Sequence, residues 1–294
     1  MNFFSISQLQ QFSGIKAHTI RIWEQRYKAL KPNRSDGNTR YYDNSQLRRL
    51  LNIASLLESD YKVSELCSMS DEKLFNLLGE QLTNSSISNE ADQYFISQLI
   101  AAGMGYDEPH FEKIFSTCLL RFGIKDTYIK VIYPMLARIG LMWSNDTIPP
   151  AQEHFISNIL RQKLFSAIDS LPPAKAVQEP WLLFLPENEF HEIGLLFAHY
   201  LIRLSGRKVI YLGTNVPLDS LKAAVKDISP VHLLFFLVHH DMPTDSQKYL
   251  NILSKSFGKT KIHFSGNPKL ISQLKTGKEI DWIQSVKDLE KRLV

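Results

Sequence analysis

The sequence predicts an α plus α/β chain with three parts: an N-terminal winged helix-turn-helix, a four-helix bundle and a C-terminal Rossmann-like (flavodoxin-like) parallel sheet. Two short amphipathic helices followed by a basic, glycine-containing segment predict the first part. Four longer amphipathic stretches predict the second part, and short apolar runs that alternate with helices from residue 181 predict the third. With 294 residues, the chain is long enough for two or three domains.

The expected domain boundaries follow changes in composition. Residues 84–90 are polar and show no periodicity, so we expect a linker there. Pro172-Pro173 ends the last of the four long helical stretches. We therefore expect a winged helix over residues 1–80, a linker over 81–90, the bundle over 91–172 and the sheet domain over 173–294.

The first two helices are expected to form a helix-turn-helix. Ser5 caps a helix whose apolar residues recur at helical spacing, and Gly14 permits a tight turn after it. A second helix is expected over residues 16–27, with an apolar face formed by Ile20, Trp23 and Tyr27. Its outward positions carry Lys16, His18, Arg21 and Gln25. A helix with basic and amide groups at its start can enter a major groove and read base edges.

A basic hairpin is expected to follow the second helix. Gly37-Asn38 lies at its tip between Arg34 and Arg40, a composition typical of a wing that contacts phosphates. Residues 1–62 carry ten Lys and Arg against five Asp and Glu, a net charge of +5 in a chain of +4. The excess positive charge therefore lies in the first fifth of the chain, as in nucleic-acid-binding domains. The residues expected to contact DNA are His18 and Arg21 near base edges, Arg34, Arg40 and Tyr41 on the backbone, and Lys16, Thr19 and Arg26.

Residues 3–60 resemble the DNA-binding domain of the MerR family. The resemblance runs through Thr19-Ile20-Arg21-Ile22-Trp23-Glu24-Gln25-Arg26-Tyr27, Lys31-Pro32-Asn33-Arg34 and Gly37-Asn38-Thr39-Arg40-Tyr41-Tyr42. It implies a winged-helix regulator that reads a pseudo-palindromic operator in double-stranded DNA. No heptad run follows this domain, so we expect the C-terminal part to form the homo-oligomer, a dimer or a tetramer.

The composition predicts a cytoplasmic protein with no membrane span. Cys67 and Cys118 each lie among apolar neighbours and form no C-x-x-C pair, which fits a reducing compartment. This counts against the metal-sensing members of the MerR family, which use cysteine thiolates near their C-terminus. No apolar stretch reaches ~18 residues, and no basic-flanked apolar run begins the chain.

The remaining elements are expected from apolar periodicity. Helices over residues 44–58 and roughly 63–78 are expected to complete the first domain. The bundle helices are expected over residues 91–105, 108–122, 125–142 and 149–170. Strands are expected at residues 181–185, 208–212, 232–238 and 261–264, with a weaker one at 280–283. Helices are expected near residues 189–204, 217–227, 244–256, 268–275 and 285–293. This alternation indicates a parallel sheet with helices on both faces and ligands at the carboxyl ends of its strands.

The loop after the first of these strands carries a candidate ligand site. His191 is placed to ligate a metal, with Glu189 or Glu192 orienting its other ring nitrogen. Gly194 lets a bulky planar ligand approach the backbone. The alternative is that a histidine at a helix start serves as a cap or a surface group.

The bundle and the sheet together resemble the cobalamin-binding module of light-responsive MerR regulators of the CarH/LitR type. That module carries E-x-H-x-x-G and W-x9-E-H, and both spacings occur here, the first over residues 189–194. The resemblance implies adenosylcobalamin as the cofactor and His191 as the lower axial ligand of its cobalt. It further implies that Trp143 packs on the upper adenosyl group, that Glu153 hydrogen-bonds this group and that His154 takes the upper position after photolysis. Without the resemblance, Trp143 is a core residue followed by a polar pair.

Two positions depart from the pattern of that module. Its Ser-x-Leu element falls near Phe236, and its Gly-Gly element falls at Gly266-Asn267. In the family, the serine contacts the nucleotide tail of the cofactor and the glycines make room for it, so Phe236 either crowds this slot or repacks it. His239-His240-Asp241 suggest a metal site, but adjacent histidines point to opposite sides of a strand, which favours an ordinary polar pair.

These features predict a transcriptional repressor whose C-terminal module binds adenosylcobalamin and senses light through it. Oligomerisation is expected to control binding to the operator, because several weak half-site contacts become tight when they are linked. The chain is not expected to be an enzyme, because it carries a DNA-binding domain and no attached catalytic domain. The alternative is a MerR-type regulator whose degenerate cobalamin-like module binds no cofactor and instead mediates oligomerisation or binds a protein antagonist.

Overall fold

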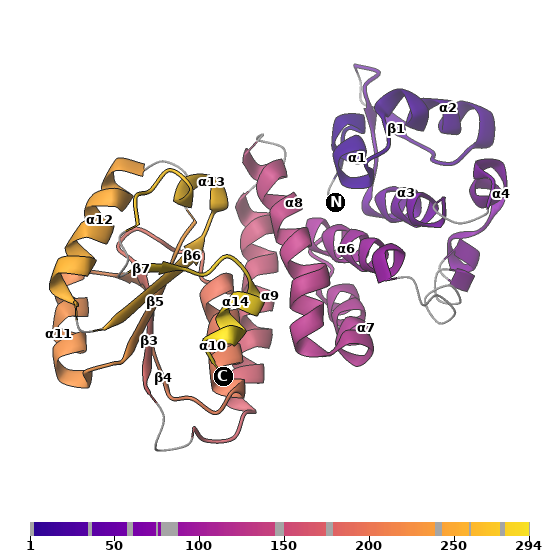
Figure 1. Ribbon diagram of the computed structural model, residues 1–294. Helices are drawn as coiled ribbons and strands as arrows, with labels where there is room; N and C mark the ends of the chain where they lie inside the picture. The colour runs from indigo at the N-terminus through magenta and orange to yellow at the C-terminus, as the bar shows by residue number, and fades with distance from the viewer. Residues whose placement is uncertain are drawn as a thin grey trace. The chain divides into compact units, whose positions relative to one another are not determined.

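The computed structural model describes residues 3–34, 37–57, 61–74, 76–77, 88–144, 150–174, 179–238, 243–258, 260–276 and 280–293. The chain (Figure 1) divides into two compact units, Met1–Ile156 and Ser157–Val294. Their boundary falls inside one long helix, whereas the last domain boundary was expected at residue 172. The first turns of this helix pack within the first unit and its later turns pack within the second.

The first unit begins with the expected helix-turn-helix. α1 (Ile6–Ser13) starts with a capping box, in which the Ser5 hydroxyl accepts the Gln8 N–H at 3.3 Å and the Gln8 side chain accepts the Ser5 N–H at 2.8 Å. Gly14 ends α1 in the left-handed region, with φ of 74°, and α2 (Ala17–Tyr27) follows. The buried residues that join the two helices are Leu9, Phe12, Ile20 and Trp23. The predicted cap, turn and apolar face are therefore confirmed.

The predicted hairpin and the helix after it are also confirmed. β1 (Asn33–Arg34) pairs antiparallel with β2 (Arg40–Tyr41), and α3 (Asn44–Leu56) follows. The helix expected over residues 63–78 is interrupted, because α4 (Val63–Ser68) ends before an extended Met69 and residues 71–74 and 76–77 are helical again. The guanidinium of Arg49 donates to the carbonyls of Cys67 and Met69 at 2.7 and 3.0 Å. These carbonyls are thereby satisfied at the point where the helix is interrupted.

The four expected bundle helices are present. They are α6 (Ser88–Met104), α7 (Glu108–Thr127), α8 (Tyr133–Ser144) and α9 (Pro150–Asp169). Gly123, with φ of 72° and ψ of 172°, kinks α7, and a π-helical turn, η1 (Tyr128–Ile132), leads into α8. Of the stretch expected as a linker, residues 88–90 belong to α6 and residues 81–87 lie outside the described residues.

The second unit contains a five-stranded parallel sheet with the order β4-β3-β5-β6-β7. All five predicted strands are confirmed: β3 (Trp181–Pro186), β4 (Val209–Val216), β5 (His232–Leu237), β6 (Lys261–Gly266) and β7 (Ile280–Trp282). β4 runs four residues past its expected end at residue 212 and pairs with β3 through two register shifts. This order is the flavodoxin-like one, with its topological switch point between β3 and β5.

Helices cover both faces of the sheet (Figure 1). They are α10 (Ile193–Leu204), α11 (Leu218–Ile228), α12 (Pro243–Ser256), α13 (Pro268–Ile271) and α14 (Val286–Lys291). The face under α11, α12 and α13 holds an apolar core that includes Phe184, Phe235 and Phe264. α10 and α14 cover the other face. Among the described residues, no helix is long and apolar enough to span a membrane.

Candidate DNA-binding and cofactor sites

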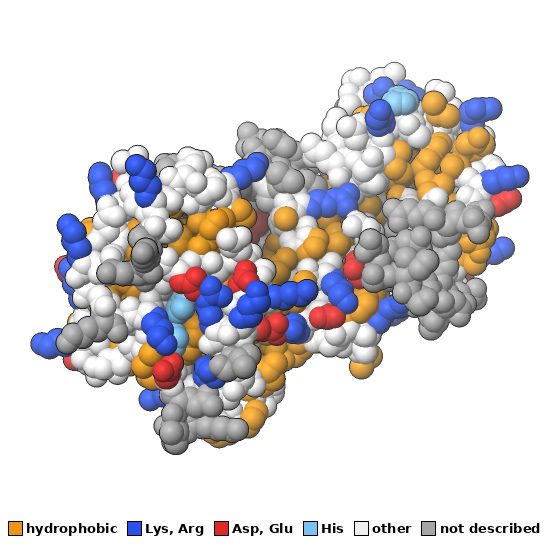
Figure 2. Space-filling model, viewed as in Figure 1, with side chains coloured by type: hydrophobic (Ala, Val, Ile, Leu, Met, Phe, Trp, Pro, Cys, Tyr) orange, Lys and Arg blue, Asp and Glu red, His pale blue; other side chains and the backbone are white. Residues whose placement is uncertain are grey.

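The outer surface of α2 carries the residues predicted to meet DNA. Lys16, His18, Arg21 and Arg26 are exposed, and Thr19 is half-buried. In Figure 2, Lys and Arg side chains and a histidine lie on the surface formed by α1 and α2. The inner side of the same helix is fixed by buried Ile20 and Trp23, so its polar groups are held outward.

The two arginines of the hairpin have different surroundings. Arg34 is exposed and donates to the side chain of Asn38 at the hairpin tip. The Arg40 Nε lies 3.2 Å from a carboxylate oxygen of Glu24, which is buried on α2 and also accepts from the Tyr42 hydroxyl. Burial, together with the Glu24 carboxylate, raises the pKa of Tyr42. Arg40, predicted as a phosphate contact, therefore joins the hairpin to α2, and Glu24 is a partner that the sequence interpretation missed.

A carboxylate at the end of β3 holds the candidate metal ligand in place. Glu189 is buried, and its Oε1 lies 2.6 Å from Nδ1 of the half-exposed His191. The same oxygen accepts the backbone N–H groups of Phe190 and His191 at 3.0 and 3.1 Å. The other oxygen accepts the Val238 N–H, after β5, at 2.9 Å. Of the two glutamates considered for orienting His191, Glu189 is the one in contact with it.

Glu192, the other glutamate considered, has different partners. Its carboxylate lies 2.6 Å from Nε of Arg161, on α9, and accepts the Tyr211 hydroxyl, on β4, at 2.7 Å. Glu192 is buried, whereas the Arg161 side chain is 39% exposed, so water reaches the pair from the side of the arginine. Burial, followed by the hydrogen bond to Glu192, raises the pKa of Tyr211. Glu192 therefore ties α9 and β4 to the start of α10 rather than orienting His191.

The Glu189–His191 pair lies at the switch point of the sheet. The chain leaves β3 toward α10 on one face and leaves β5 toward α12 on the other. Ligands of open parallel sheets bind where the connections diverge at the carboxyl ends of neighbouring strands. Because Glu189 follows β3 and accepts the amide after β5, it spans this point. The geometry fits a protein imidazole that ligates a metal while a carboxylate fixes its other nitrogen.

The space above Gly194 is filled by an aromatic ring. A Cβ atom added at Gly194 would lie 2.7 Å from Cε1 and 3.0 Å from Cδ1 of Phe236. Gly194 was expected to let a planar ligand approach the backbone, whereas the group close to it in this structure is the Phe236 side chain. Residues around His191 therefore fit an axial ligand of cobalt, whereas the space between Gly194 and β5 does not fit a nucleotide tail.

Gly266 was also expected to make room for the cofactor. The backbone conformation gives another reason for a glycine at this position. Its φ is 136°, and an added Cβ would lie 1.9 Å from the Leu237 carbonyl oxygen. That carbonyl accepts the Asn267 N–H at 2.8 Å. Glycine is therefore required here by the close approach of two neighbouring strand ends.

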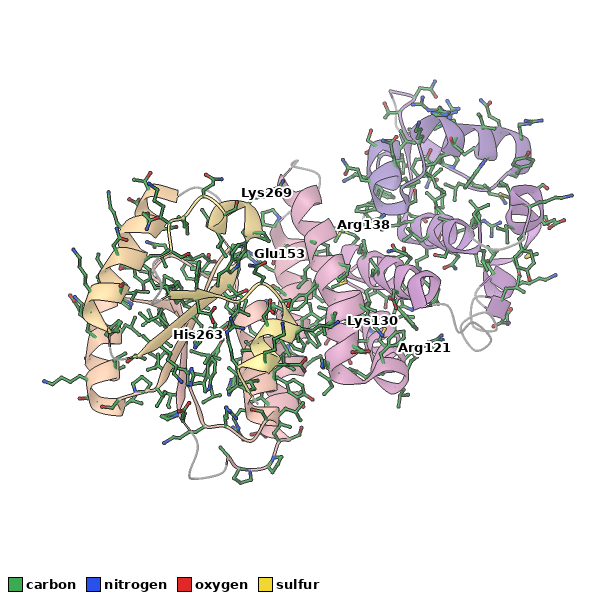
Figure 3. All side chains as sticks on the ribbon, in the orientation of Figure 1. Arg121, Lys130, Arg138, Glu153, His263 and Lys269 are labelled. Carbon is green, nitrogen blue, oxygen red and sulfur yellow. The ribbon has the colours of Figure 1, made fainter. Side chains whose placement is uncertain are left out.

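The second predicted group of cofactor residues belongs to the other unit. On α9, Glu153 and His154 form a pair at 3.0 Å, and the His154 side chain is 72% exposed. Trp143 belongs to α8, but its side chain lies outside the described part of the chain. Figure 3 labels Glu153 on α9. The structure brings Glu153 to His154 and Glu189 to His191, each pair within its own unit.

The two cysteines and the His239-His240-Asp241 segment were also considered as candidate sites. Cys67 and Cys118 are buried free thiols, and burial raises the pKa of both. They therefore serve as small apolar side chains, as expected. The candidate pair in His239-His240-Asp241 lies outside the described residues.

Comparison with known families agrees with this arrangement. Residues 4–72 match the MerR HTH family of regulatory proteins, and residues 90–166 match the B12 binding domain. The chain is therefore a transcriptional regulator that combines a MerR-type helix-turn-helix with a B12 binding domain.

The chain is similar to individual proteins over most of their length. The chain is 27% identical to the HTH-type transcriptional repressor CarH of Myxococcus xanthus over 230 residues, which cover 77% of this chain and 76% of the relative. It is 24% identical to the repressor CarA of the same organism over 228 residues, covering 76% and 73%. The monomethylamine corrinoid protein of Methanosarcina barkeri shares the fold, with a TM-score of 0.55, 14% identity and coverage of 69% and 98%. The two repressors agree with the expectation of a regulator rather than an enzyme.

Proposed function

We propose that this protein is a DNA-binding repressor that uses adenosylcobalamin as its ligand and as a light-sensing chromophore. The single observation that carries the proposal is the contact between Glu189 and His191 at the switch point of the sheet. The names of the two similar repressors and the match to the B12 binding domain support it. When bound, adenosylcobalamin supplies a weak cobalt–carbon bond that light can break.

The proposed role of the Glu189–His191 pair is to present one ring nitrogen to cobalt. Glu189 accepts from Nδ1 of His191, which fixes the tautomer and directs Nε2 as the ligating atom. Backbone amides of Phe190, His191 and Val238 hold the carboxylate, so the imidazole is oriented before a ligand arrives. Such preorganisation lowers the entropic cost of binding.

The proposed roles of the bundle residues concern the opposite, upper side of the cofactor. Trp143 would pack against the adenosyl group, Glu153 would hydrogen-bond it, and His154 would hold cobalt once that group has left. His154 and Glu153 lie in the first turns of α9, whose later turns bind Glu192 through Arg161. A change at His154 therefore acts on a helix that contributes to both units.

The proposed switch works through oligomer state. A ligand that favours one assembly by a few kcal/mol is sufficient to change its population strongly. An oligomer presents several basic helix-turn-helix surfaces to a pseudo-palindromic operator, and linked half-site contacts bind far more tightly than single ones. We propose that the adenosyl form holds the oligomer in the dark and that light dissolves it.

The test uses the full chain with adenosylcobalamin in the dark and after green light. We expect one cofactor per chain after gel filtration, an oligomer in the dark, a smaller species in light and parallel loss of operator binding. His191→Ala should weaken binding and shift the visible spectrum. His154→Ala should still photolyse but lack the spectrum of cobalt held by two imidazoles. Identical elution and DNA binding in dark and light, with cofactor bound and photolysed, would remove the light-sensing part.

A second candidate function is favoured by the contact between Phe236 and Gly194. Because a side chain fills this space, the module of a cofactor-independent regulator would instead mediate oligomerisation or bind a protein antagonist. The discriminating result is the absorbance of the protein after incubation with excess corrinoid and desalting. Elution free of any corrinoid, with operator binding intact, would replace the first proposal with this one.

A further inference from the structure

Phe236 belongs to the same group of contacts that positions His191. It lies in β5 between Phe235, which packs in the apolar core against Phe184 and Phe264, and Leu237. Since side chains alternate along a strand, Phe236 faces the other side of the sheet, where α10 begins. Its ring there contacts the backbone of Gly194, in the first turn of α10.

The position of this ring is fixed from two directions. Phe236 pairs in register with Ser265 of β6, whose hydroxyl donates to the Ile283 carbonyl at 2.8 Å. Two residues after Phe236, the Val238 amide donates to the carboxylate of Glu189. The end of β5 and the loop that carries His191 are thus joined by one hydrogen bond, and the Phe236 ring fills the space next to that loop.

The chemistry of the proposed ligand makes this space important. Cobalamin carries a nucleotide below its corrin ring, and the base at its end can itself bind the lower face of cobalt. If His191 takes that lower position, the base must leave cobalt and the nucleotide needs room on the same side as His191. Gly194 lies three residues after His191, and the Phe236 ring fills the space that an added side chain at Gly194 would take.

We propose that Phe236 makes the module select corrinoids that lack the lower nucleotide, such as adenosylcobinamide, over complete adenosylcobalamin. This proposal rests on the proposed function, because it takes His191 as the lower ligand of cobalt. A complete cobalamin has to displace the Phe236 ring from Gly194 or leave its nucleotide in water. A corrinoid without the nucleotide meets His191 and leaves the packing between β5 and α10 intact.

The test is an equilibrium titration of the full chain in the dark, followed by visible absorbance. The probes are adenosylcobinamide and adenosylcobalamin. Wild-type protein should bind adenosylcobinamide at least tenfold more tightly. Phe236→Ser should remove this preference by improving the affinity for adenosylcobalamin. The control is Leu204→Ser, because Leu204 is the last residue of α10, is 53% exposed and lies outside the loop that carries His191. This control should keep the wild-type preference.

The possible failures are distinguishable. If wild type binds both corrinoids equally and Phe236→Ser changes neither affinity, the role of Phe236 is overturned while the proposed cofactor binding stands. If neither corrinoid binds wild type, both proposals fall. If Phe236→Ser does not fold, as judged by circular dichroism, Phe236→Leu replaces it, since it keeps an apolar side chain but shortens the group over Gly194. Unchanged preference in Phe236→Leu would also overturn the inference.

Discussion

The indole of Trp181 lies parallel to the imidazole of His232, with ring centroids 4.1 Å apart and an interplanar angle of 2°. His232 Nδ1 is 2.9 Å from His263 Nε2, and His263 Nδ1 is 3.0 Å from a carboxylate oxygen of Asp281. Arg292 donates to both oxygens of that carboxylate. Figure 3 labels His263 in the sheet unit. A chain of hydrogen-bonded polar groups, His232, His263 and Asp281, therefore crosses β5, β6 and β7, and Trp181 stacks on its first histidine.

This chain predicts that acid destabilises the second unit. Burial lowers the pKa of His263 to about 4, although the Asp281 hydrogen bond opposes it, and burial also lowers the pKa of His232 against the effect of Glu179. Lys261 and Arg207 further disfavour charge on His232. The pKa of each histidine in the folded protein therefore lies below that in the unfolded chain, which binds protons below about pH 6.5. Stability is therefore fully present above that pH and falls as the pH drops toward 4.

Asp281 extends the same trend to lower pH. Burial acts to raise the pKa of Asp281, but hydrogen bonds from Arg292 and His263 outweigh it and lower the pKa. Its contribution is present above about pH 4 and is lost as the pH falls further. For His263, complete titration corresponds to roughly 3 kcal/mol at most. Thermal unfolding between pH 7 and 4 measures this effect, and His263→Asn should reduce the slope. Equal slopes in wild type and variant would contradict the assignment.

The strands of this network could be predicted from the sequence, but the network could not. Each strand is a short apolar run. Such a run between two helices can be recognised from the sequence without knowing which strand it pairs with. His232 and His263 are 31 residues apart and meet only because β5 and β6 pair in a particular register. Single-sequence periodicity does not contain that register.

The candidate site shows the same distinction. The contact between Glu189 and His191 is local, so the motif spacing was sufficient to suggest it. The partner of Glu192 lies on a helix of the preceding bundle segment, and the ring over Gly194 comes from β5. The early end of α4 likewise depends on Arg49 from α3. These contacts need the tertiary fold, which propensity alone does not supply.

Arg138 predicts a coupling between the bundle and the DNA-binding helices within the first unit. From α8, its guanidinium donates to the carbonyls of Gln11, at 3.1 Å, and Phe12, both in the last turn of α1. These carbonyls lack partners within the helix, and a cation there also favours the helix dipole. Arg138 is half-buried, and burial lowers its pKa, so this interaction is partly shielded from water. Arg138→Met should lower the free energy of unfolding by about 1.5–3 kcal/mol and speed amide exchange in α1.

The matched control for this variant is Arg121→Met. Arg121 is exposed on α7, and Figure 3 shows both arginines. Its replacement should change the free energy of unfolding by less than about 0.5 kcal/mol. Operator affinity should fall in Arg138→Met but not in Arg121→Met, because only Arg138 contacts the helix that precedes α2. Equal effects of the two variants on exchange and DNA binding would refute the coupling.

We expect replacement of Arg34 to affect mainly DNA binding and replacement of Arg40 to affect mainly stability. Arg34→Ala should weaken binding to all sequences and reduce the salt slope by about one, with little change in stability. Arg40→Ala should lower the free energy of unfolding by about 1–3 kcal/mol, because it leaves the buried carboxylate of Glu24 without its cation. Arg21→Ala should instead relax base preference. Titrations at several salt concentrations, together with thermal unfolding, test this separation. An unchanged midpoint in Arg40→Ala would contradict the role of Glu24.

The last prediction concerns Glu189 and uses Glu192 as its matched control. Both glutamates are buried and lie three residues apart, but only Glu189 accepts from His191. The Glu189 carboxylate accepts three backbone N–H groups and contacts Nδ1 of His191, so the NH2 group of Glu189→Gln would meet another hydrogen-bond donor. Corrinoid affinity should therefore fall about 10–100-fold, with a changed visible spectrum. Glu192→Gln weakens the pair with Arg161 and should reduce stability while leaving corrinoid affinity within a few-fold of wild type. Equal losses of corrinoid affinity in the two variants would show that Glu189 acts only through the stability of the loop.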